Sequence, residues 1–472
     1  MKTGVLDQFV EIVGERHALR TATDIASYVE DARGRFGGSC SLVLRPSCVE
    51  EVSRIMALAT KTKTPIIPQG GNTGLVGGGL PLRGGSSDEV ILSLGRMNRI
   101  IQVDEDTNTI TVEAGVILEN IQNTADDIDR LFPLSLGAQG TCQIGGNIST
   151  NAGGTGVLAY GNTRDLVMGL EVVLPSGEIL NGLSKLRKDN TGYDLKNLFV
   201  GSEGTLGIVT KAVLKLFPKP RGREVGFVAL NSPEKALQLL NQAKAKAGNG
   251  LTAFELMADM AMQFTLKHTE GARAPIQGDH SWYALVEISS GKSSEDAQST
   301  LESILEEAFE ADLIADATIA ATLEQQNAFW KLREDMSGAQ KPEGASIKHD
   351  IAVPVGEVPN FIALADKAVL KIVPKARIVN FGHMGDGNLH YNISQPVGWS
   401  AEDFFAQEAQ IHQAVYKIVK KLNGSISAEH GIGQLKREEL LTVKDPVTME
   451  LMRSIKQTLD PLGILNPSKV LK

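Results

Sequence analysis

Two clusters of glycine constrain what this chain can fold into more than any other feature of its sequence. Residues 70–85 contain eight glycines and residues 137–161 contain eight more, out of 48 in a chain of 472 residues. Neither cluster has the Gly-X-Y repeat of collagen. Because glycine has no Cβ, its backbone N–H groups can approach a ligand closely. We therefore expect each cluster to form a loop that wraps a large ligand.

The first cluster directly follows a predicted strand, in the sequence PIIPQGGNTGLVGGG over 65–79. Backbone N–H groups of such a loop can converge on phosphate oxygens. The chain has no GxGxxG that precedes a predicted helix and no GxxxxGK[ST], which argues against the commonest cradles for NAD and ATP. The second cluster, GAQGTCQIGGNISTNAGGTG over 137–156, adds hydroxyl and amide groups that can bind a phosphate or a ring edge. Two such loops imply a long ligand, and a dinucleotide such as FAD is the natural candidate.

Charge and cysteine content exclude several other classes of protein. The formal net charge is −9, which disfavours nucleic acid as a partner. The three cysteines, Cys40, Cys48 and Cys142, include no CxxC pair, so neither a disulfide framework nor a structural zinc or iron–sulfur site is expected. The N-terminus lacks the apolar core of a signal peptide, and no run of 18 apolar residues predicts a transmembrane segment. We expect a cytoplasmic protein, or the mature form of an organellar one.

Local patterns divide the chain into four parts, which are listed here by residue number. They are a helical lead-in (1–38), a first α+β domain rich in glycine loops (39–219), a second α+β domain (220–445) and a C-terminal segment (446–472). In the second domain, helices are predicted over 233–247, 294–309 and 320–338, and a strand over 346–355. The fold class is therefore α+β.

A predicted hairpin in the second domain carries two histidines, in the sequence FGHMGDGNLHYN over 381–392. If Asp386-Gly387 forms a two-residue turn, position 383 pairs with 390. His383 and His390 would then face each other with Cβ atoms about 5 Å apart. Asn392 would lie on the same face. Such a pair suits a divalent metal, although a cross-strand histidine pair without a metal is the alternative.

The segment SAEHGIG over 427–433 offers a third ligand. His383, His390 and Glu429 would make a His₂Glu set with an open position, as catalytic zinc has. Zinc is the first candidate, and manganese or iron could use the same ligands. His430 is not counted as a ligand, because imidazole titrates near neutral pH and suits a general base.

The motifs PQGGNTGLVGG, IGGNISTNAGG and NTGYDLKNLFVGSEGTLGIVT, with Asn466-Pro467 near the end, resemble the FAD-linked oxidase family. The resemblance covers roughly residues 40–472 in the expected order. It implies a PCMH-type FAD-binding domain, of the kind found in vanillyl-alcohol oxidase, followed by an α+β substrate domain, with 446–472 returning to the FAD domain. Within the family the chain is most similar to the D-2-hydroxyglutarate dehydrogenases, whose relatives include D-lactate and glycolate dehydrogenases.

The resemblance also implies which residues contact FAD. They are Gln69, Gly70, Gly71, Asn72, Thr73, Gly74 and Leu75 at the pyrophosphate, Gly140, Thr141, Gly145, Gly146, Thr150 and Asn151 at the flavin and its linker, Gly204 and Ile208 on the adenine side, and Asn466. Relatives that bind flavin covalently often have a histidine in the first loop, where this chain has Asn72-Thr73. We therefore expect non-covalent FAD and interpret Cys142 as a packing residue.

By the same resemblance, Arg333, Ser337 and Lys348 bind substrate, together with Asn392 and His430. Arg333 and Ser337 lie four residues apart on a predicted helix and so share one face. Ser337 stands where the D-2-hydroxyglutarate dehydrogenases are expected to have threonine, which keeps the hydroxyl and loses a methyl group. Two cations and a metal exceed what one carboxylate needs, which favours a dicarboxylate.

The sequence therefore predicts an FAD- and metal-dependent dehydrogenase that converts D-2-hydroxyglutarate, and also D-malate, to the 2-oxo acid. His430 would take the hydroxyl proton while the flavin N5 takes the hydride. One alternative is a D-lactate or glycolate dehydrogenase, or a subunit of one, and an alternative of another class is a flavin-free metal hydrolase. The electron acceptor is left open between an electron-transfer flavoprotein, a quinone and a cytochrome, and a homodimer is the common oligomeric state.

Overall fold

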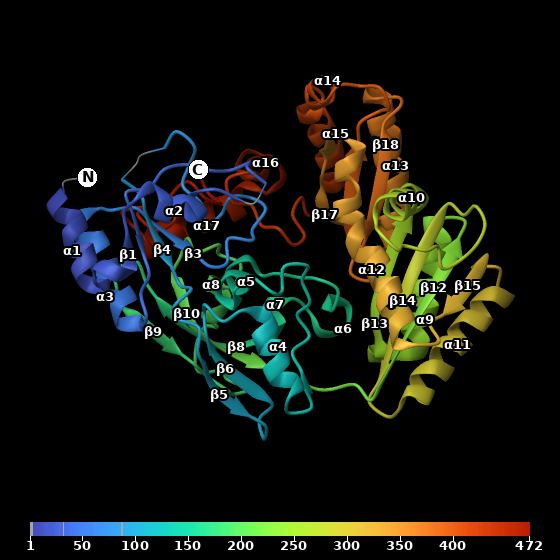
Figure 1. The fold of residues 1–472 in the computed structure, drawn as a ribbon, viewed down its shortest axis with the longest axis horizontal. Coiled ribbons are helices and arrows are strands. Elements are labelled where there is room, and N and C mark those ends of the chain that lie inside the picture. Colours follow the sequence, from blue (N-terminus) through green and yellow to red (C-terminus); the bar gives the residue numbers. More distant parts are fainter. Residues whose placement is uncertain (1–2, 32, 86–87) are drawn as a thin grey trace. The chain divides into compact units, whose positions relative to one another are not determined.

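A computed structural model describes residues 3–31, 33–85 and 88–472. The chain forms two compact units (Figure 1). The first unit contains 1–154, 160–218 and 429–472, and the second contains 155–159 and 219–428. Residues 1, 2 and 32 of the expected lead-in, and 86 and 87 of the expected FAD domain, lie outside the described residues. The chain re-enters the first unit at Glu429, earlier than the residue 446 that we expected.

The first unit begins with a small sheet in the strand order β1-β2-β4-β3, in which β2, β4 and β3 are parallel. Its strands are β1 (Ala18–Leu19), β2 (Leu42–Leu44), β3 (Ile66–Gln69) and β4 (Val90–Ser93). The three parallel strands are almost entirely buried, as a sheet covered on both faces requires. Helix α3 (Val49–Thr62) joins β2 to β3 and buries Val52, Ile55 and Met56 in the core. The first glycine loop starts where β3 ends.

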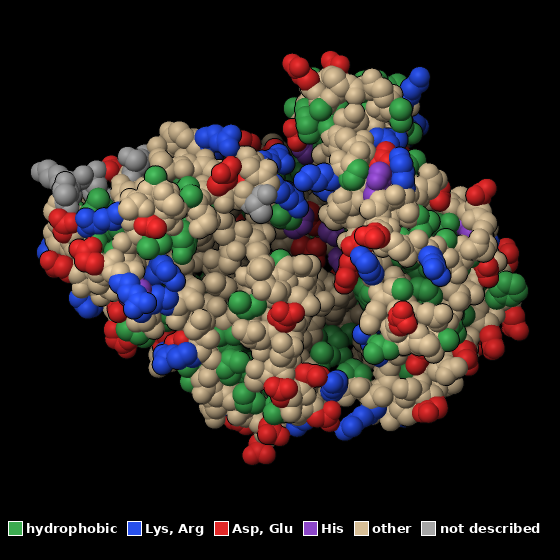
Figure 2. Space-filling model, in the orientation of Figure 1, with side chains coloured by type: hydrophobic (Ala, Val, Ile, Leu, Met, Phe, Trp, Pro, Cys, Tyr) green, Lys and Arg blue, Asp and Glu red, His purple; other side chains and the backbone are tan. Residues whose placement is uncertain are grey.

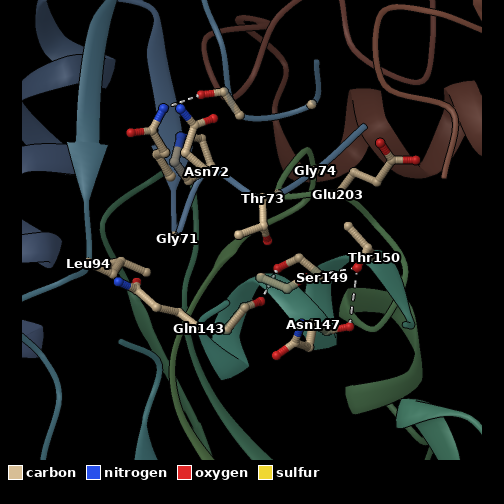
Figure 3. A pocket seen from close by; sticks show the side chains of 18 of the residues that line it. Gly71, Asn72, Thr73, Gly74, Leu94, Gln143, Asn147, Ser149, Thr150 and Glu203 are labelled. Atoms are coloured by element: carbon tan, nitrogen blue, oxygen red, sulfur yellow. Dashed lines mark hydrogen bonds between the residues drawn. The ribbon is translucent and has the colours of Figure 1, made fainter. Parts of the chain in front are cut away.

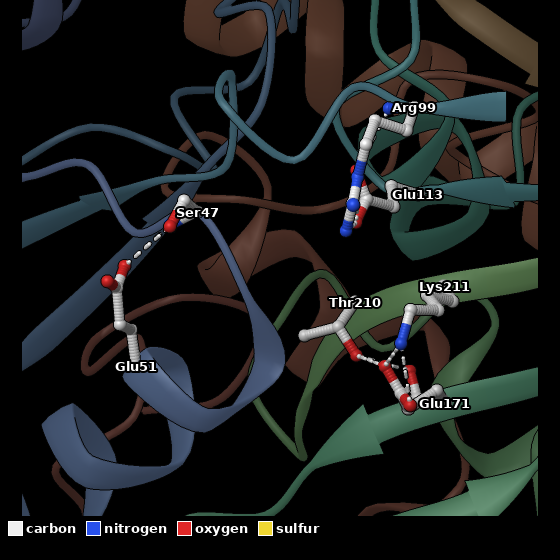
Figure 4. A network of polar contacts seen from close by, with 7 residues as sticks. All are labelled: Ser47, Glu51, Arg99, Glu113, Glu171, Thr210 and Lys211. Atoms are coloured by element: carbon white, nitrogen blue, oxygen red, sulfur yellow. Dashed lines mark hydrogen bonds and ion pairs between the residues drawn. The ribbon is translucent and has the colours of Figure 1, made fainter. Parts of the chain in front are cut away.

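An antiparallel sheet in the order β5-β6-β10-β8-β9 follows. Its strands are β5 (Ile100–Asp104), β6 (Thr109–Glu113), β8 (Val167–Val173), β9 (Ile179–Gly182) and β10 (Ile208–Lys215), and β7 (Arg130–Leu131) pairs with β11 (Phe217–Pro218) beside it. Buried carboxylates on β6 and β8 are satisfied by cations (Figure 4). Glu113 accepts from Arg99 at 2.7 Å, and Glu171 accepts from Thr210 at 2.9 Å and Lys211 at 3.1 Å. These ion pairs are structural parts of the sheet.

Short helices and the C-terminal segment complete the first unit. They are α1 (Thr3–Val13), α2 (Ala22–Val29), α4 (Leu118–Asp126), α5 (Ile144–Thr150), α7 (Thr163–Leu166), α8 (Lys196–Phe199), α16 (Arg437–Val443) and α17 (Pro446–Leu459), while α6 (Val157–Tyr160) spans a boundary between the units. The chain end returns to the first sheet, where the Ile66 N–H donates to the Ile464 carbonyl at 2.8 Å. Helix α17 forms the first part of the segment 446–472.

The second unit is built on an eight-stranded antiparallel sheet, in the order β15-β12-β14-β13-β18-β19-β16, with β17 also paired to β19. Its strands are β12 (Gly222–Leu230), β13 (Leu251–Ala258), β14 (Trp282–Ser290), β15 (Asp316–Ile319), β16 (Ser346–Ile347), β17 (Asp350–Ala352), β18 (Arg377–Gly382) and β19 (Asn388–Ser394). Strand β13 is buried along its whole length and lies between β14 and β18. It is therefore a central strand.

Helices cover both faces of this sheet (Figure 1). They are α9 (Pro233–Ala247), α10 (Asp259–His268), α11 (Ser294–Glu310), α12 (Leu323–Ala339), α13 (Val358–Ile372), α14 (Ala401–Phe405) and α15 (Glu408–Lys421). On one face, α10 and α12 share a hydrophobic core with Phe227 and Phe381. On the opposite face, Leu301 of α11 lies over Gly226 of β12. The helices predicted over 233–247, 294–309 and 320–338 are confirmed as α9, α11 and α12.

The hairpin register that we predicted from Asp386-Gly387 is wrong. His390 pairs with Phe381 rather than with His383, and residues 383–387 form a five-residue loop between β18 and β19. Asp386 turns the chain differently, because its side chain accepts the Asn388 N–H at 3.0 Å. Gly387 has φ of 86°, and a Cβ there would lie 2.1 Å from the Val353 carbonyl oxygen. The glycine thus permits close packing against the chain after β17.

The single strand that we predicted over 346–355 is also wrong in part. It is divided into β16 and β17, and both parts keep one register against β19. The gap falls at Lys348 and His349. The buried His349 ring donates from Nδ1 to the Tyr391 carbonyl at 2.9 Å. At the gap, this carbonyl of β19 therefore accepts a hydrogen bond from a side chain.

Acidic and basic side chains are interspersed over the visible face of each unit (Figure 2). In residues 3–31, 33–85 and 88–472, every helix is too short or too polar to cross a membrane.

Candidate functional site

A cavity in the first unit is lined by both glycine loops, by the chain around residues 203–209 and by His430. Its volume is about 1010 Å³, part of which is open to solvent. In Figure 3, Thr73 and Gly74 of the first loop lie across the cavity from Ser149 and Thr150 of α5. The two sequence clusters therefore meet at one cavity.

The glycines around the cavity fall into two groups. A Cβ at Gly71 would lie 2.3 Å from the Thr141 carbonyl oxygen, and a Cβ at Gly145 would lie 2.7 Å from the Ala114 side chain. These glycines let the loops pack against their neighbours. By contrast, a Cβ at Gly74 or Gly146 would meet no atom within 4 Å among the described residues. The backbone at these two positions faces open space in the cavity.

Eleven of the residues expected to contact FAD line the cavity: Gln69, Gly70, Gly71, Asn72, Thr73, Gly74, Gly145, Gly146, Thr150, Gly204 and Ile208. Leu75, Gly140, Thr141, Asn151 and Asn466 are outside its lining. Asn466 instead donates to the Gly78 carbonyl at 3.0 Å and to the Glu203 carbonyl at 2.8 Å. Its amide joins the first glycine loop to the loop that contains Glu203.

Several lining residues were not predicted from the sequence. Gln143 and Asn147 line the cavity, and each has a buried side-chain oxygen that accepts no hydrogen bond within the described part of the chain. Both residues belong to the second glycine cluster. Their amide side chains could have marked them in the sequence as ligand-binding candidates, because a buried amide oxygen needs a hydrogen-bond donor.

Glu203 holds the loop that carries His430. Its carboxylate accepts the Ile432 N–H at 2.7 Å and the Gly433 N–H at 2.8 Å. Burial raises the pKa of Glu203, and these N–H groups partly offset that rise. Burying a carboxylate is costly unless it is well bonded, so these contacts fix the loop firmly. His430 is therefore anchored at the rim of the glycine-lined cavity.

Two further residues of the first unit bear on the expected chemistry. The Glu429 carboxylate accepts the Gly154 N–H at 2.5 Å, and Glu429 and Gly154 each lie directly beside a point where the chain passes between units. Cys142 lines the cavity but is buried, and burial raises the pKa of its thiol. A neutral thiol is a poor nucleophile, so Cys142 does not suit a covalent flavin bond.

In the second unit, His383 and His390 lie together despite the wrong register. Their ring centroids are 5.5 Å apart and the rings are nearly perpendicular. His383 is buried, and its Nδ1 is 2.8 Å from Oε1 of Glu255. Asn392 is buried two residues beyond His390, on the same face of β19 by strand alternation.

Three more of the five expected substrate residues also lie in this unit. Arg333 is buried on α12, where its Nε donates to Oε2 of Glu255 at 2.8 Å and its guanidinium lies 4.9 Å from the Phe381 ring centroid. Ser337 follows one turn later on α12 and is exposed. Lys348 is exposed, and its Nζ donates to the Ser337 carbonyl at 3.2 Å. The structure therefore brings Lys348 to the end of α12 that carries Arg333 and Ser337.

Comparison with known proteins identifies the class. A family model described as an FAD binding domain matches residues 40–182, and one described as the C-terminal domain of FAD linked oxidases matches residues 219–470. The chain belongs to the FAD-linked oxidase family. It is an oxidoreductase with a PCMH-type FAD-binding domain, as the sequence predicted.

Curated relatives match along nearly the whole chain. A mitochondrial D-2-hydroxyglutarate dehydrogenase of Arabidopsis thaliana is 41% identical, over 98% of this chain and 80% of that protein. The Danio rerio protein of the same name is 40% identical, over 92% of this chain and 79% of its own length. A Schizosaccharomyces pombe relative, named provisionally as a mitochondrial D-lactate dehydrogenase, is 36% identical over 94% of this chain and 84% of its own.

Solved structures share the fold at low identity. Substrate-bound p-cresol methylhydroxylase matches 99% of this chain and 96% of its own with a TM-score of 0.77 at 17% identity. An alkyldihydroxyacetonephosphate synthase matches 99% of this chain and 85% of its own with a TM-score of 0.74, also at 17% identity.

Proposed function

We propose that this protein oxidises D-2-hydroxyglutarate, and also D-malate, to the 2-oxo acid with non-covalent FAD and a divalent metal. The observation that carries the proposal is the position of His430, which lines the same cavity as both glycine loops. A base beside a flavin site is what the oxidation of a hydroxyl group requires. The names of the Arabidopsis and Danio relatives agree with this substrate.

The cavity fits FAD on two grounds. Gly74 lines the cavity, and a Cβ there would meet no atom within 4 Å among the described residues, so bare backbone of the first loop faces space that a phosphate could occupy. The buried oxygens of Gln143 and Asn147 accept no bond from any described residue, and they would suit the N–H edge of a flavin ring. When bound, FAD supplies the acceptor for the two electrons of the oxidation.

The donor set also fits a divalent metal. We propose His383, His390 and Glu429 as ligands, with zinc as the first candidate and manganese or iron as alternatives. The chain itself supports the third ligand, because Ala352 of β17 pairs with Ser425, and β17 pairs with the strand of His390. Glu429 follows Ser425 by only four residues, so the Cα atoms of these two residues are at most about 14 Å apart. When bound, the metal would lower the pKa of the substrate hydroxyl.

The chain's own residues would divide the remaining work. His430 accepts the hydroxyl proton on a ring nitrogen, and the N–H bonds to Glu203 keep its loop in place. Arg333 and Lys348 provide two positive charges for a dicarboxylate, while Ser337 and Asn392 offer hydrogen bonds. A dicarboxylate could pair with both cations, whereas a monocarboxylate such as lactate could pair with only one of them.

The electron acceptor is proposed to be an electron-transfer flavoprotein, a quinone or a cytochrome, and the protein to act as a homodimer. We propose a cytoplasmic or organellar location, since several relatives are named as mitochondrial.

Anaerobic mixing of the purified holoprotein with single 2-hydroxy acids tests this proposal. D-2-hydroxyglutarate and also D-malate are expected to bleach the flavin, and L-2-hydroxyglutarate not at all. Bleaching by D-lactate or glycolate without bleaching by D-2-hydroxyglutarate would favour a D-lactate or glycolate dehydrogenase instead. A colourless protein that hydrolyses esters or amides would contradict the proposal and favour the metal hydrolase.

A further inference from the structure

Glu255 is a carboxylate in the middle of the apolar central strand β13, whose sequence is LTAFELMA. All eight residues of this strand are buried, and Glu255 is only 1% exposed. An ionised carboxylate in such a place is strongly unfavourable unless it is paired and hydrogen-bonded. Its presence therefore calls for a specific role.

The two oxygens of Glu255 serve two different residues. Oε1 lies 2.8 Å from Nδ1 of His383, and Oε2 accepts from Nε of Arg333 at 2.8 Å. The sheet sets the first contact, because Leu256 and Met257 of β13 pair with Gly382 and Phe381 of β18. The Arg333 guanidinium packs over the Phe381 ring, which fixes its plane. One carboxylate thus joins a proposed metal ligand to a proposed substrate residue.

The contact with Glu255 determines which nitrogen of the His383 ring carries the lone pair when the ring is neutral. An ionised carboxylate only accepts hydrogen bonds, so Nδ1 carries a proton, and in the neutral ring Nε2 then carries the lone pair. Glu255 therefore orients the His383 ring so that Nε2 points away from the carboxylate, as a metal ligand requires.

The contact with Arg333 leaves part of the guanidinium available. Its Nη2 is buried and donates no hydrogen bond within residues 3–31, 33–85 and 88–472. A buried guanidinium nitrogen without an acceptor is costly. A carboxylate ligand would satisfy it, while Glu255 holds Nε and so limits the rotation of the fork.

We propose that Glu255 is a positioning residue that orients His383 for the metal and Arg333 for a substrate carboxylate at the same time. This inference rests on the proposed function, because it takes His383 as a metal ligand and Arg333 as a substrate residue. It goes beyond that function by making metal affinity and substrate affinity depend on one buried side chain.

The test is Glu255→Gln in the FAD-loaded protein, with zinc affinity measured after chelation, by titration against a competing chelator. Glutamine has the same shape, but an NH₂ group replaces one oxygen, so it offers an acceptor at only one of the two positions that face His383 and Arg333. We expect zinc to bind about 10- to 100-fold more weakly. We also expect a higher KM for D-2-hydroxyglutarate, an unchanged flavin spectrum and an unchanged FAD content.

Glu287→Gln is the matched control. Glu287 lies on the neighbouring strand β14 and also accepts from an arginine Nε, that of Arg223 at 2.7 Å. Its partners include neither His383 nor Arg333, so this variant should keep the zinc affinity and KM of the unmodified protein. Arg333→Lys separates the two effects further, since it should raise KM and leave zinc affinity within about twofold.

Zinc affinity and KM within about twofold of the unmodified protein in Glu255→Gln would overturn the inference and leave the proposed function intact. Failure of the unmodified protein to bind one zinc would instead overturn the proposed metal site, and this inference with it. If Glu255→Gln does not fold, Glu255→Asp decides, because it keeps the charge but withdraws it by about 1.5 Å, one C–C bond. Weaker zinc binding in Glu255→Asp supports positioning, and unchanged zinc binding and KM would contradict it.

Discussion

The two units build their candidate sites from different materials. In the first unit, bare backbone forms the cavity wall, and Gly71 and Gly145 are needed because a Cβ would collide with neighbouring atoms. In the second unit, buried side chains carry the site, and Glu255 links His383 to Arg333. We therefore expect the first site to lose ligand binding when atoms are added to its glycines. We expect the second site to lose it when a charge or a hydrogen-bond acceptor is removed.

The largest effect on turnover is expected at His430, to which we assign the transfer of the hydroxyl proton. His430→Ala should lower kcat by about 10²–10⁴-fold, since a positioned base contributes that much. FAD should remain bound, because the glycine loops are untouched. Stopped-flow measurement of flavin reduction, beside the FAD content of the protein, checks this. His280→Ala is the control, because the His280 ring lies in the second unit, 3.1 Å from the Gln277 carbonyl and with its centroid 6.0 Å from that of Tyr283, and is not part of the cavity lining. Equal rates in His430→Ala and the unmodified protein would refute the assignment.

A second prediction adds one carbon to each kind of cavity glycine. Gly71→Ala places a Cβ 2.3 Å from the Thr141 carbonyl oxygen, so it should cost about 2–4 kcal/mol of stability and weaken FAD binding. Gly74→Ala has no atom within 4 Å among the described residues, so it should leave the melting temperature of the FAD-free protein nearly unchanged. Its FAD affinity should still fall where the ligand approaches the backbone. Thermal melts and FAD titrations of both variants separate packing from ligand contact, and equal melting temperatures would contradict the division.

A smaller effect is expected at Asp366 of α13, which accepts from the Tyr391 hydroxyl at 2.8 Å. Burial raises the pKa of Asp366 to about 6, and the Tyr391 bond only partly opposes it. The folded protein therefore binds this proton more tightly than the unfolded chain, whose aspartates titrate near 4. The contribution of Asp366 to the free energy of unfolding should be greatest below about pH 4. It should fall as the pH rises from about 4 to about 6.

Asp366→Asn removes that titration and keeps an oxygen that can accept from Tyr391. It should stabilise the protein by about 1–2 kcal/mol at pH 7 and have little effect at pH 4. Denaturant unfolding at both pH values measures the difference. If Asp366→Asn raised the free energy of unfolding less at pH 7 than at pH 4, the predicted direction of the pKa shift would be contradicted.

The sequence predicted those parts of the site that depend on local pattern. The glycine clusters, the α+β fold class, helices α9, α11 and α12 and the nearness of two histidines on a hairpin all follow from residues close in the chain. The register of that hairpin was wrong, because the Asp386 side chain turns the loop and the packing of Gly387 against Val353 is a tertiary contact.

Long-range contacts could not be predicted in the same way. Glu255 and His383 are 128 residues apart, and Glu203 and Ile432 are 229 apart. A lone glutamate in an apolar strand was a visible signal at Glu255, but its partners were not. Glu203 gave a weaker signal, because SEGTLG is also an ordinary glycine turn.

Metal removal tests most directly the central claim that backbone and side-chain sites serve one reaction. The holoprotein is treated with a chelator, freed of metal, and mixed anaerobically with D-2-hydroxyglutarate. We predict that the flavin stays bound and is no longer reduced at the original rate, and that zinc or manganese restores reduction. Unchanged flavin reduction by the metal-free protein would contradict the assignment of a metal to this reaction.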